Sequence, residues 1–533
     1  MEHQNLKYLT KKQLLQRLQQ RFTTTEKKLS HIPSPTLLYN GEKAAKKIAL
    51  AIQQKKKITL VGDYDVDGVS ASAIMVDFFR QIPYPLEVII PNRFNDGYGI
   101  SPNVLQKIDT DIIITVDNGI SAIQAAEICK ERGIELIITD HHTPGDTLPD
   151  AYTIVNPKLP QDTYPFQEIC GAQVAWLVLA LIKKELSLQI DMKQFLDILA
   201  IAIIADVMPL IDINRTLVKE GLKLLQNSPR PASIIIRDFI NKSTISSEDI
   251  AFNIAPRLNS AGRLDDASLA LEFLTATNTH TAYMLFEELN QLNEERKELE
   301  ALITQEAMQC VNQDDLVIVV WGEDWHEGVI GIVASRLVDK FKKPAIVFSV
   351  NEGIAKGSAR SLGEVDIYQL IKENSHYLTK FGGHKMAAGL ALEEENLPLF
   401  QQSINQSAKK IEKEAFIPKE NIMGILSIKD IDDELLHILK QFEPFGEANK
   451  RPLFLFQDVE VLNVSLMGKD KSHSRIQIRE NPSQTQTLEL IAFKTVYKIP
   501  HNKQLTCSYS VNENEYGGRK SLQLLVDKIF EED

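Results

Sequence analysis

Residues 58–72, ITLVGDYDVDGVSAS, decide how this chain begins to fold: a short apolar run leads into aspartates and then into a helical pattern. Residues 58–61 are typical of a buried strand, and residues 69–80 have the periodicity of a helix. Aspartates occupy alternate positions where the strand ends, at Asp63, Asp65 and Asp67. Carboxylates this close repel one another and resist desolvation, so we expect a cation to bind between them.

Length and composition describe a multidomain globular protein of 533 residues, of which 44% are hydrophobic and 25% charged. No apolar run approaches the roughly 18–20 residues of a membrane span, and the first residues lack the apolar core of a signal peptide. The four cysteines are far apart without a CxxC pair, which predicts a reduced, cytoplasmic protein without zinc fingers. The net charge of −13 leaves nucleic acid open as a partner, because local charge decides binding.

Apolar, strand-like runs alternate with helix-length segments from residue 41 onward. This alternation predicts a parallel sheet covered by helices on both faces. The carboxyl ends of parallel strands meet at one edge of a sheet, which is where ligands bind. The predicted strands are residues 58–61, 86–90, 112–116, 136–139 and 152–155.

Each of these strands is followed by polar side chains. After the aspartates of the first strand come Asn92-Arg93, Asp117-Asn118, Asp140-His141-His142 and Asn156-Pro157-Lys158. Clustered carboxylates and neutral imidazoles are the ligands of Mg²⁺ and Mn²⁺, and two such ions can activate water and stabilise an in-line displacement at phosphorus. The absence of GxxxxGK[ST] from the sequence argues against a P-loop NTPase.

Simpler interpretations exist for single members of this set. Asp67 precedes a glycine and a helical pattern, so alone it would fit a helix N-cap. A lone His141-His142 pair would fit a polar loop. Asp206 lies within the apolar helical stretch AIAIIADVMPL, where an unpaired buried carboxylate is costly, so a metal is the favoured partner.

The chain divides into five predicted segments. Residues 1–40 form a helical N-terminal appendage, 41–225 the first α/β domain, and 226–312 a helical connector with one long helix at 285–310. Residues 313–412 form a second α/β domain, and 413–533 a strand-rich tail that predicts a small β-barrel.

Cations and aromatic residues in the tail are typical of single-strand binding, although a solvated face around a barrel core explains them nearly as well. They are Lys450, Arg451, Lys469, Lys471, Arg475 and Arg479, with Phe454, Phe456 and Tyr497.

The motifs GDYDVDG, ITVDNG, TDHH and IADVMPL resemble the four successive motifs of the DHH phosphoesterase superfamily. GVIGIVASRL, GSARS and FGGHKMAAG resemble its accessory DHHA1 domain. RFNDGYGIS and APRLNSAGRLDDA narrow the resemblance to the RecJ family of single-strand-specific 5′→3′ DNA exonucleases, over roughly residues 55–530. The resemblance implies a DHH domain with a parallel sheet, a long connecting helix, an α/β DHHA1 domain and a C-terminal OB-fold.

The resemblance also implies a dinuclear Mn²⁺ or Mg²⁺ site. Its ligands would be Asp63, Asp65, Asp67, Asp117, His141 and Asp206, with Asp117 bridging. His142 would touch the scissile phosphate, and Asp140 would orient a histidine. Some branches of the superfamily place a histidine where this chain has Val61, so Asp63 is expected to substitute for it.

Substrate contacts are implied on both sides of a cleft. The DHHA1 motifs would bind the 5′-terminal phosphate through a compact turn with Ser358 and Arg360 and through glycine-rich backbone at Gly382, Gly383 and His384. Arg93, Arg257, Asn259 and Arg263 would contact the DNA backbone, and Tyr98 would stack on a base. Tight packing turns and a structural tyrosine are the alternatives.

Together these features predict a cytoplasmic, monomeric exonuclease of DNA repair and recombination that takes single-stranded DNA by its 5′ end and releases 5′-mononucleotides. The family resemblance adds a single-strand binding protein and a helicase as partners. Two rivals remain, a DHH phosphodiesterase of short oligonucleotides or cyclic dinucleotides and a catalytically silent single-strand binding protein.

Overall fold

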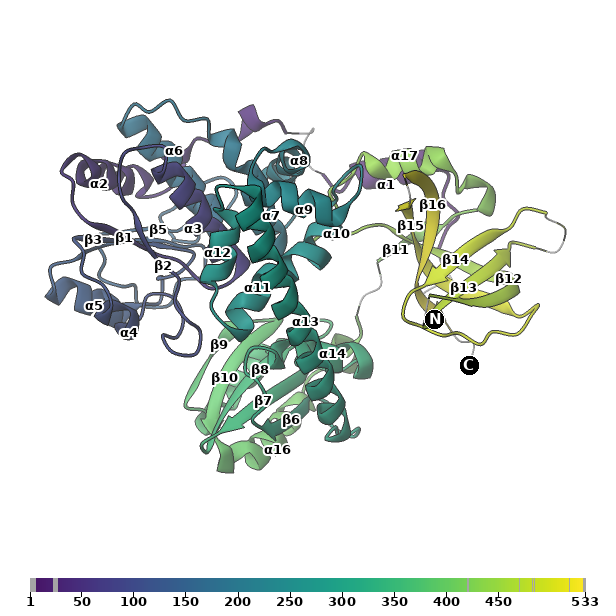
Figure 1. The fold of residues 1–533 in the computed structure, drawn as a ribbon. Helices are drawn as coiled ribbons and strands as arrows, with labels where there is room; N and C mark the ends of the chain where they lie inside the picture. Colours follow the sequence, from purple (N-terminus) through teal and green to yellow (C-terminus); the bar gives the residue numbers. More distant parts are fainter. Residues whose placement is uncertain are drawn as a thin grey trace.

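The chain forms three lobes in the computed structural model, which describes residues 6–22, 27–418, 421–468, 470–481, 483, 485–516 and 518–530 (Figure 1). A parallel sheet with its helices lies at the left of Figure 1, a mixed sheet lies below, and a strand-rich barrel lies at the right. This architecture confirms the predicted α/β class with a helical connector and a C-terminal barrel. Within these residues, no helix is long and apolar enough to cross a membrane.

The first sheet contains five parallel strands in the order β2-β1-β3-β4-β5. Val61, the last residue of β1, pairs with Ile89 of β2 and Thr115 of β3, so the carboxyl ends of the strands lie level at one edge. All five predicted strands are confirmed to within one residue at each end. They are β1 (Ile58–Val61), β2 (Glu87–Ile89), β3 (Ile112–Val116), β4 (Glu135–Thr139) and β5 (Thr153–Val155).

Helices cover both faces of this sheet, as predicted. Leu60 and Ile114 pack into one core, whereas Val61 and Ile113 pack into the other, because successive side chains of a strand point to opposite faces. Helices α2 (Gly41–Gln53), α3 (Val66–Phe79), α6 (Gly171–Glu185), α7 (Leu196–Ala205) and α8 (Asp212–Asn227) belong to the first core, and α4 (Pro102–Gln106) and α5 (Ile123–Glu131) to the second.

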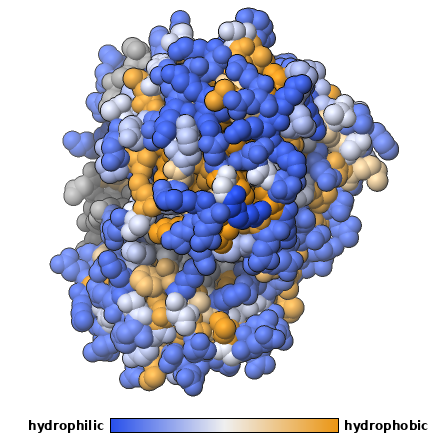
Figure 2. Space-filling view, turned by 90° about the vertical axis from the view of Figure 1, so that its left-hand side faces the viewer, coloured by the Kyte–Doolittle hydropathy of each residue, from blue (hydrophilic) through white to orange (hydrophobic). Residues whose placement is uncertain are grey.

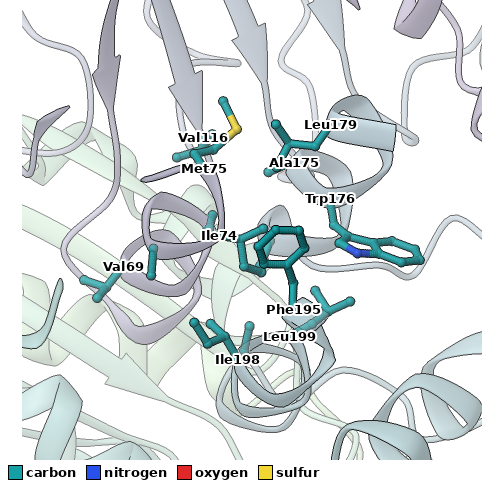
Figure 3. Packing of buried hydrophobic residues seen from close by; sticks show 14 of the residues in the cluster. Val69, Ile74, Met75, Val116, Ala175, Trp176, Leu179, Phe195, Ile198 and Leu199 are labelled. Atoms are coloured by element: carbon teal, nitrogen blue, oxygen red, sulfur yellow. The ribbon is translucent and has the colours of Figure 1, made fainter. Parts of the chain in front are cut away.

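The larger core is built around aromatic and aliphatic side chains of several helices (Figure 3). Phe195 lies among Ile74 of α3, Trp176 of α6 and Leu199 of α7. Each fully buried side chain of this size contributes about 1.5–3 kcal/mol relative to exposure. Such a core can hold in place the charged side chains that gather at the edge of the sheet.

The connector is helical and ends in one long helix. It comprises α9 (Pro231–Ile240), α10 (Ser247–Asp249), the π-helix η5 (Ile250–Ile254), α11 (Ala255–Leu264), α12 (Ser268–Leu274) and α13 (Thr279–Gln309). Helix α13 begins at Thr279, earlier than the predicted start at residue 285, because the side chain of Asn278 accepts a hydrogen bond from the backbone N–H of Thr281 and caps the helix.

The second lobe is a five-stranded sheet in the order β6-β7-β8-β10-β9. It contains β6 (Ile318–Glu323), α14 (Ile330–Phe341), β7 (Ala345–Asn351), β8 (Ile354–Arg360), α15 (Ile367–Glu373), β9 (Lys380–His384), β10 (Ala387–Glu393) and α16 (Leu397–Ala408). Two predicted turns are wrong. The GSARS segment forms the end of strand β8, and Gly382 and Gly383 lie in the edge strand β9, because both segments pair antiparallel with β10.

The tail closes into a barrel because β12 pairs with both β13 and β15, while β16 joins β15 to β14. Its elements are β11 (Ile422–Ile425), α17 (Asp433–Lys440), β12 (Leu453–Met467), β13 (His473–Arg479), β14 (Leu488–Ala492), β15 (Gln504–Tyr516) and β16 (Arg519–Phe530). The N-terminal helix α1 (Lys11–Gln19) packs here, since Leu14 and Leu18 share a core with Phe454.

The structure favours the barrel-core interpretation for several of the basic and aromatic residues in the tail. Phe454 and Phe456 are buried and cannot stack on a base from solvent. Arg451 forms an ion pair with Glu248 of the connector, and Arg479 forms one with Glu460. Lys469 lies outside the described residues.

Candidate metal centre and its cleft

The predicted ligands gather around His141 at the carboxyl edge of the first sheet. The Nε2 atom of His141 lies 3.1 Å from Oδ1 of Asp117, which follows β3. It lies 3.6 Å from Oδ2 of Asp206, at the end of α7, and 3.7 Å from Oδ2 of Asp67, in the first turn of α3. Elements far apart in the sequence therefore bring four potential ligands together.

Three overlapping groups of side chains could hold a cation, each with donor atoms within 4.8 Å of one another. The groups share members, because Asp117 belongs to two of them and His141 to two. Two neighbouring cations require shared ligands, so this overlap fits a site with two metal ions. The groups are Asp117, His141 and His142; Asp67, His141 and Asp206; and Asp63, Asp65 and Asp117.

The chemistry of these donors fits a bound divalent cation. Both carboxylate oxygens of Asp117, Oδ2 of Asp206 and Nδ1 of His141 are buried without a hydrogen-bond partner among the described residues. Burial, followed by the charges of Asp67, Asp65 and Asp63, raises the pKa of Asp117 well above its usual value. Burial lowers the pKa of His141, which favours the neutral imidazole that binds metals. Positive charge placed among these oxygens would offset the cost of burying them.

Asp117 has an unusual backbone conformation, with a left-handed φ of 62°. Neighbouring Asn118 stabilises this turn, because its Nδ2 donates to the carbonyl oxygens of Val61 and Val116, and its Oδ1 accepts from the N–H of Ile100. Backbone strain of this kind costs about 1–3 kcal/mol and is typical of functional sites. The turn directs the Asp117 carboxylate into the cluster.

The three aspartates of the first motif have different local partners. Asp65, not Asp67, is the N-cap of α3, because its Oδ1 accepts from the N–H groups of Asp67 and Gly68. Asp63 accepts from the N–H of Tyr64 and is only 2% exposed. Gly68 is required for this packing, since a Cβ there would lie 2.5 Å from the Cβ of Asp63.

Asp206 occupies a different position from the one predicted. It is the C-cap of α7 rather than an interior residue of a helix, and its side chain is 25% exposed. The helix ends because Val207 adopts a left-handed φ of 54°. Burial and the charges of Asp67 and Asp65 still raise the pKa of Asp206 well above its usual value.

Asp140 holds His142 in position. Oδ1 of Asp140 lies 2.8 Å from Nδ1 of His142 and also accepts from the backbone N–H groups of His141 and His142. Burial alone would lower the pKa of His142, but the hydrogen bond and charge of Asp140, with the charges of Asp63 and Asp65, raise it to about 9. This favours the protonated form of His142, whose Nε2 lies 3.5 Å from the hydroxyl of Tyr98.

Three arginines from separate elements approach one another beside this cluster. Arg93 follows β2, Arg263 lies in α11 and Arg360 ends β8. Burial and then the charge of Arg93 lower the pKa of Arg360 and lower that of Arg263 to about 10. Within the described residues none of the three forms an ion pair, although Arg263 donates to the carbonyl of Gly328 and Arg360 to Ser358. Three positively charged side chains so close together favour the binding of an anion.

The other predicted substrate contacts divide into two groups. Arg257 is buried and bonded to Asn253 and Asn290, so it supports the fold. Asn259 accepts from the N–H of Val66 and also lines a surface pocket, so it remains open to a ligand. Gly382, Gly383 and His384 lie on the exposed edge strand β9. Burial, followed by the charges of Lys158 and His142, lowers the pKa of His384.

Two features of the site were not predicted. Gly171 and Ala172 at the start of α6 donate backbone N–H bonds to Asp67, and the motif CGAQVAW before an apolar helix was the available signal. A pocket of about 560 Å³ also lies beside Asp206, between α7, the π-helix η5 and the segment before β12. Two of its lining residues are strongly exposed, Val207 at 64% and Phe252 at 76%. No sequence pattern marks Phe252 as exposed.

The surface on the side of the first sheet is mostly hydrophilic, with hydrophobic residues showing near mid-height (Figure 2).

A parallel sheet whose carboxyl edge carries a carboxylate–histidine cluster, together with a second α/β lobe, defines a phosphoesterase of the DHH type. The DHH family N-terminal domain matches residues 57–203, the DHHA1 domain residues 313–410, and the RecJ OB domain residues 422–528.

Similar proteins extend over nearly the whole chain. The single-stranded-DNA-specific exonuclease RecJ of Haemophilus influenzae is 34% identical and is matched over 95% of this chain and 93% of its own length. The RecJ of Bacillus subtilis is 36% identical over 91% of this chain, which spans 62% of that relative. The chain therefore belongs to the RecJ family, as the sequence motifs predicted.

Solved structures agree with this assignment. RecJ of Thermus thermophilus in complex with Mn²⁺ has a TM-score of 0.80 and 28% identity, covering 93% of this chain and 72% of that one. The exonuclease RecJ bound to manganese has a TM-score of 0.62 and 34% identity. The match covers 71% of this chain and 96% of that one. Another Thermus structure holds Mg²⁺, so these relatives bind both of the ions that the sequence predicted.

Proposed function

We propose that this protein is a single-strand-specific 5′→3′ DNA exonuclease that uses two Mn²⁺ or Mg²⁺ ions and releases 5′-mononucleotides. The observation that carries the proposal is the position of Arg93, Arg263 and Arg360 beside the carboxylate–histidine cluster. Arginines bind a terminal phosphate well, and the cluster lies where the adjoining phosphodiester would be. If the arginines bind a 5′-terminal phosphate, the cluster beside them would meet the first phosphodiester and release one nucleotide at a time.

Asp63, Asp65, Asp67, Asp117, His141 and Asp206 would hold the ions. When bound, the two cations would lower the pKa of a water nucleophile and neutralise charge that develops on the phosphate oxygens. His142, as a cation oriented by Asp140, would contact a non-bridging oxygen of the scissile phosphate. Tyr98, which packs edge-on against His142, would cover the first base.

The pocket beside Asp206 supports a path for the rest of the strand. Phe252 offers an exposed ring, and Lys450, shortly before β12 of the barrel, lines the same pocket. An aromatic ring with nearby cations is how proteins bind single strands without reading sequence. The strand would leave the cluster along this pocket and continue towards the tail, which resembles an OB-fold.

A direct test uses single-stranded DNA labelled at either end, with Mn²⁺ and with the wild type or Asp117→Ala. We expect the 5′ label to appear first as a mononucleotide, duplex DNA to resist, and the variant to be inactive. First release of the 3′ label would overturn the polarity, and an active Asp117→Ala variant would overturn the role of that ligand.

The two rival functions have weaker support. Every predicted metal-ligand position carries a side chain that can bind a metal, which argues against a silent binding protein. The barrel and the pocket beside Asp206 would be unnecessary for a phosphodiesterase of dinucleotides. A cytoplasmic role in repair and recombination, as a monomer working with a helicase and a single-strand binding protein, follows from the family and belongs to this proposal.

A further inference from the structure

The start of helix α6 contacts two members of the candidate metal centre. The N–H of Gly171 donates to Oδ2 of Asp67 at 2.6 Å, and the N–H of Ala172 donates to Oδ1 at 2.9 Å. Asp67 itself lies in the first turn of α3, whose own first N–H groups donate to Asp65, so the Asp67 carboxylate takes its backbone bonds from α6. The end of α6 stabilises negative charge there, because its first N–H groups lack partners within the helix.

Gly171 also leaves space for Asp117. A Cβ at position 171 would lie 2.4 Å from the Cβ and from Oδ1 of Asp117, closer than real contacts allow. The backbone of Gly171 is not left-handed, so a glycine is required at this position for space and not for backbone conformation. One residue thus donates to one candidate ligand and makes room for another.

Buried hydrogen bonds hold this helix start in place. The N–H of Cys170 donates to Oε1 of Gln173, whose Nε2 donates to Oδ1 of Asn214 on α8. Nδ2 of Asn214 donates in turn to the carbonyl of Pro209, in the segment that follows Asp206. Gln173 and Asn214 are at most 1% exposed, so water does not compete for these bonds. The network couples the position of α6 to the segment that carries Asp206.

We propose that the backbone N–H groups of Gly171 and Ala172 are positioning groups of the metal centre, which fix the Asp67 carboxylate towards His141 and Asp206 and thereby set the affinity for the divalent cation. This inference rests on the proposed metal-dependent function. Groups that orient a metal ligand typically contribute a factor of about 10–100 in metal affinity.

Two variants remove the proposed groups in different ways. Gly171→Ala adds a methyl group against Asp117. Replacement of Ala172 by lactic acid exchanges its N–H for an ester oxygen and adds no bulk, so it removes one bond to Asp67 even if Gly171→Ala fails to fold. Gly145→Ala is the matched control, since the nearest atom to its new Cβ is 3.9 Å away.

Mn²⁺ affinity is measured by electron paramagnetic resonance of the free ion, and the unfolding midpoint is measured in EDTA. We expect the lactic acid variant to bind Mn²⁺ about 10–100-fold more weakly with an unchanged midpoint in EDTA, and Gly171→Ala, if it folds, to bind at least as weakly. Exonuclease activity of both should recover as Mn²⁺ is raised. Gly145→Ala should match the wild type.

Wild-type Mn²⁺ affinity in the lactic acid variant would overturn this inference. If Asp117→Ala nevertheless lost Mn²⁺ binding, the metal centre itself would stand and only the role of α6 would fall. If the wild type bound no Mn²⁺, both the proposed metal-dependent function and this inference would be overturned.

Discussion

Nδ1 of His142 lies 2.8 Å from Oδ1 of Asp140, and the same oxygen accepts the backbone N–H groups of His141 and His142. Oδ2 of Asp140 accepts from the N–H of Ile120, so the whole carboxylate is occupied within the protein. Burial would raise the pKa of Asp140, but its bonds and the charge of His142 lower it below the usual value. Asp140 therefore stays ionised and orients the His142 ring, instead of binding a cation itself.

His142→Gln should lower the turnover number by about 10²–10³-fold, since a positioned donor to an oxygen that develops charge contributes a factor of this size. Asp140→Asn should give a smaller loss, and the two changes together should lose little more than His142→Gln alone, because Asp140 acts through His142. Single-turnover kinetics of all three variants measure this. Additive losses in the double variant would contradict the coupling, and His376→Gln on the second lobe is the exposed control.

Asp117→Asn should change stability in opposite directions with and without metal. In EDTA the variant should unfold at a higher temperature than the wild type, because it removes a buried charge among Asp63, Asp65 and Asp67. Each 1 kcal/mol gained in the free energy of unfolding raises Tm by about 2–4 °C. With Mn²⁺ the wild type should gain stability and the variant should not.

Differential scanning calorimetry in both buffers measures this reversal. Asp150→Asn, which alters an exposed ion pair with Lys130, serves as the control for removing a carboxylate. An equal Mn²⁺-induced increase in Asp117→Asn would show that Asp117 does not bind the ion.

Arg360→Gln should reduce kcat/KM about 10–100-fold for DNA with a 5′-phosphate, because a hydrogen bond to a charged group is worth about 1.5–3 kcal/mol. DNA with a 5′-hydroxyl should be affected less, so the preference for a 5′-phosphate should shrink. Competition between the two substrates measures the ratio. Lys356→Gln, on the same strand β8 and paired with Glu327, should keep the wild-type preference.

Phe252→Ala should weaken binding of long single strands while leaving dinucleotides unaffected, because the ring lies in the pocket beside Asp206. Stacking on one base contributes about 1–3 kcal/mol, which predicts a rise in Kd of about 5–150-fold. Fluorescence anisotropy with a series of oligonucleotide lengths locates the length at which the loss begins. Equal effects at every length would place Phe252 outside the strand path, and Tyr283→Ala on α13 is the exposed aromatic control.

Local patterns predicted the first sheet well because its strands are short apolar runs bounded by polar residues. The strands β1 and β3 begin and end where the sequence predicted, and Asp117 and Asp140 follow directly from β3 and β4. The GSARS and glycine-rich segments were predicted as turns because glycine and serine favour turns locally. Pairing with β10 overrides that preference. The GSARS segment pairs with residues far along the chain, such as Arg360 with Ala387, whereas the glycine-rich segment forms a short hairpin with β10.

The sequence by itself determined the alternation of strands and helices, the polar ends of the strands, and hence the identity of the candidate ligands. Those properties depend on residues within a few positions of one another. The tertiary structure alone decided which carboxylates share His141, that Asp67 accepts from Gly171, and that Arg93, Arg263 and Arg360 meet. These contacts join segments up to hundreds of residues apart, whose distances depend on how the cores pack. The motif GDYDVDG therefore predicted a metal site, and only the packed structure assigned each aspartate its partners.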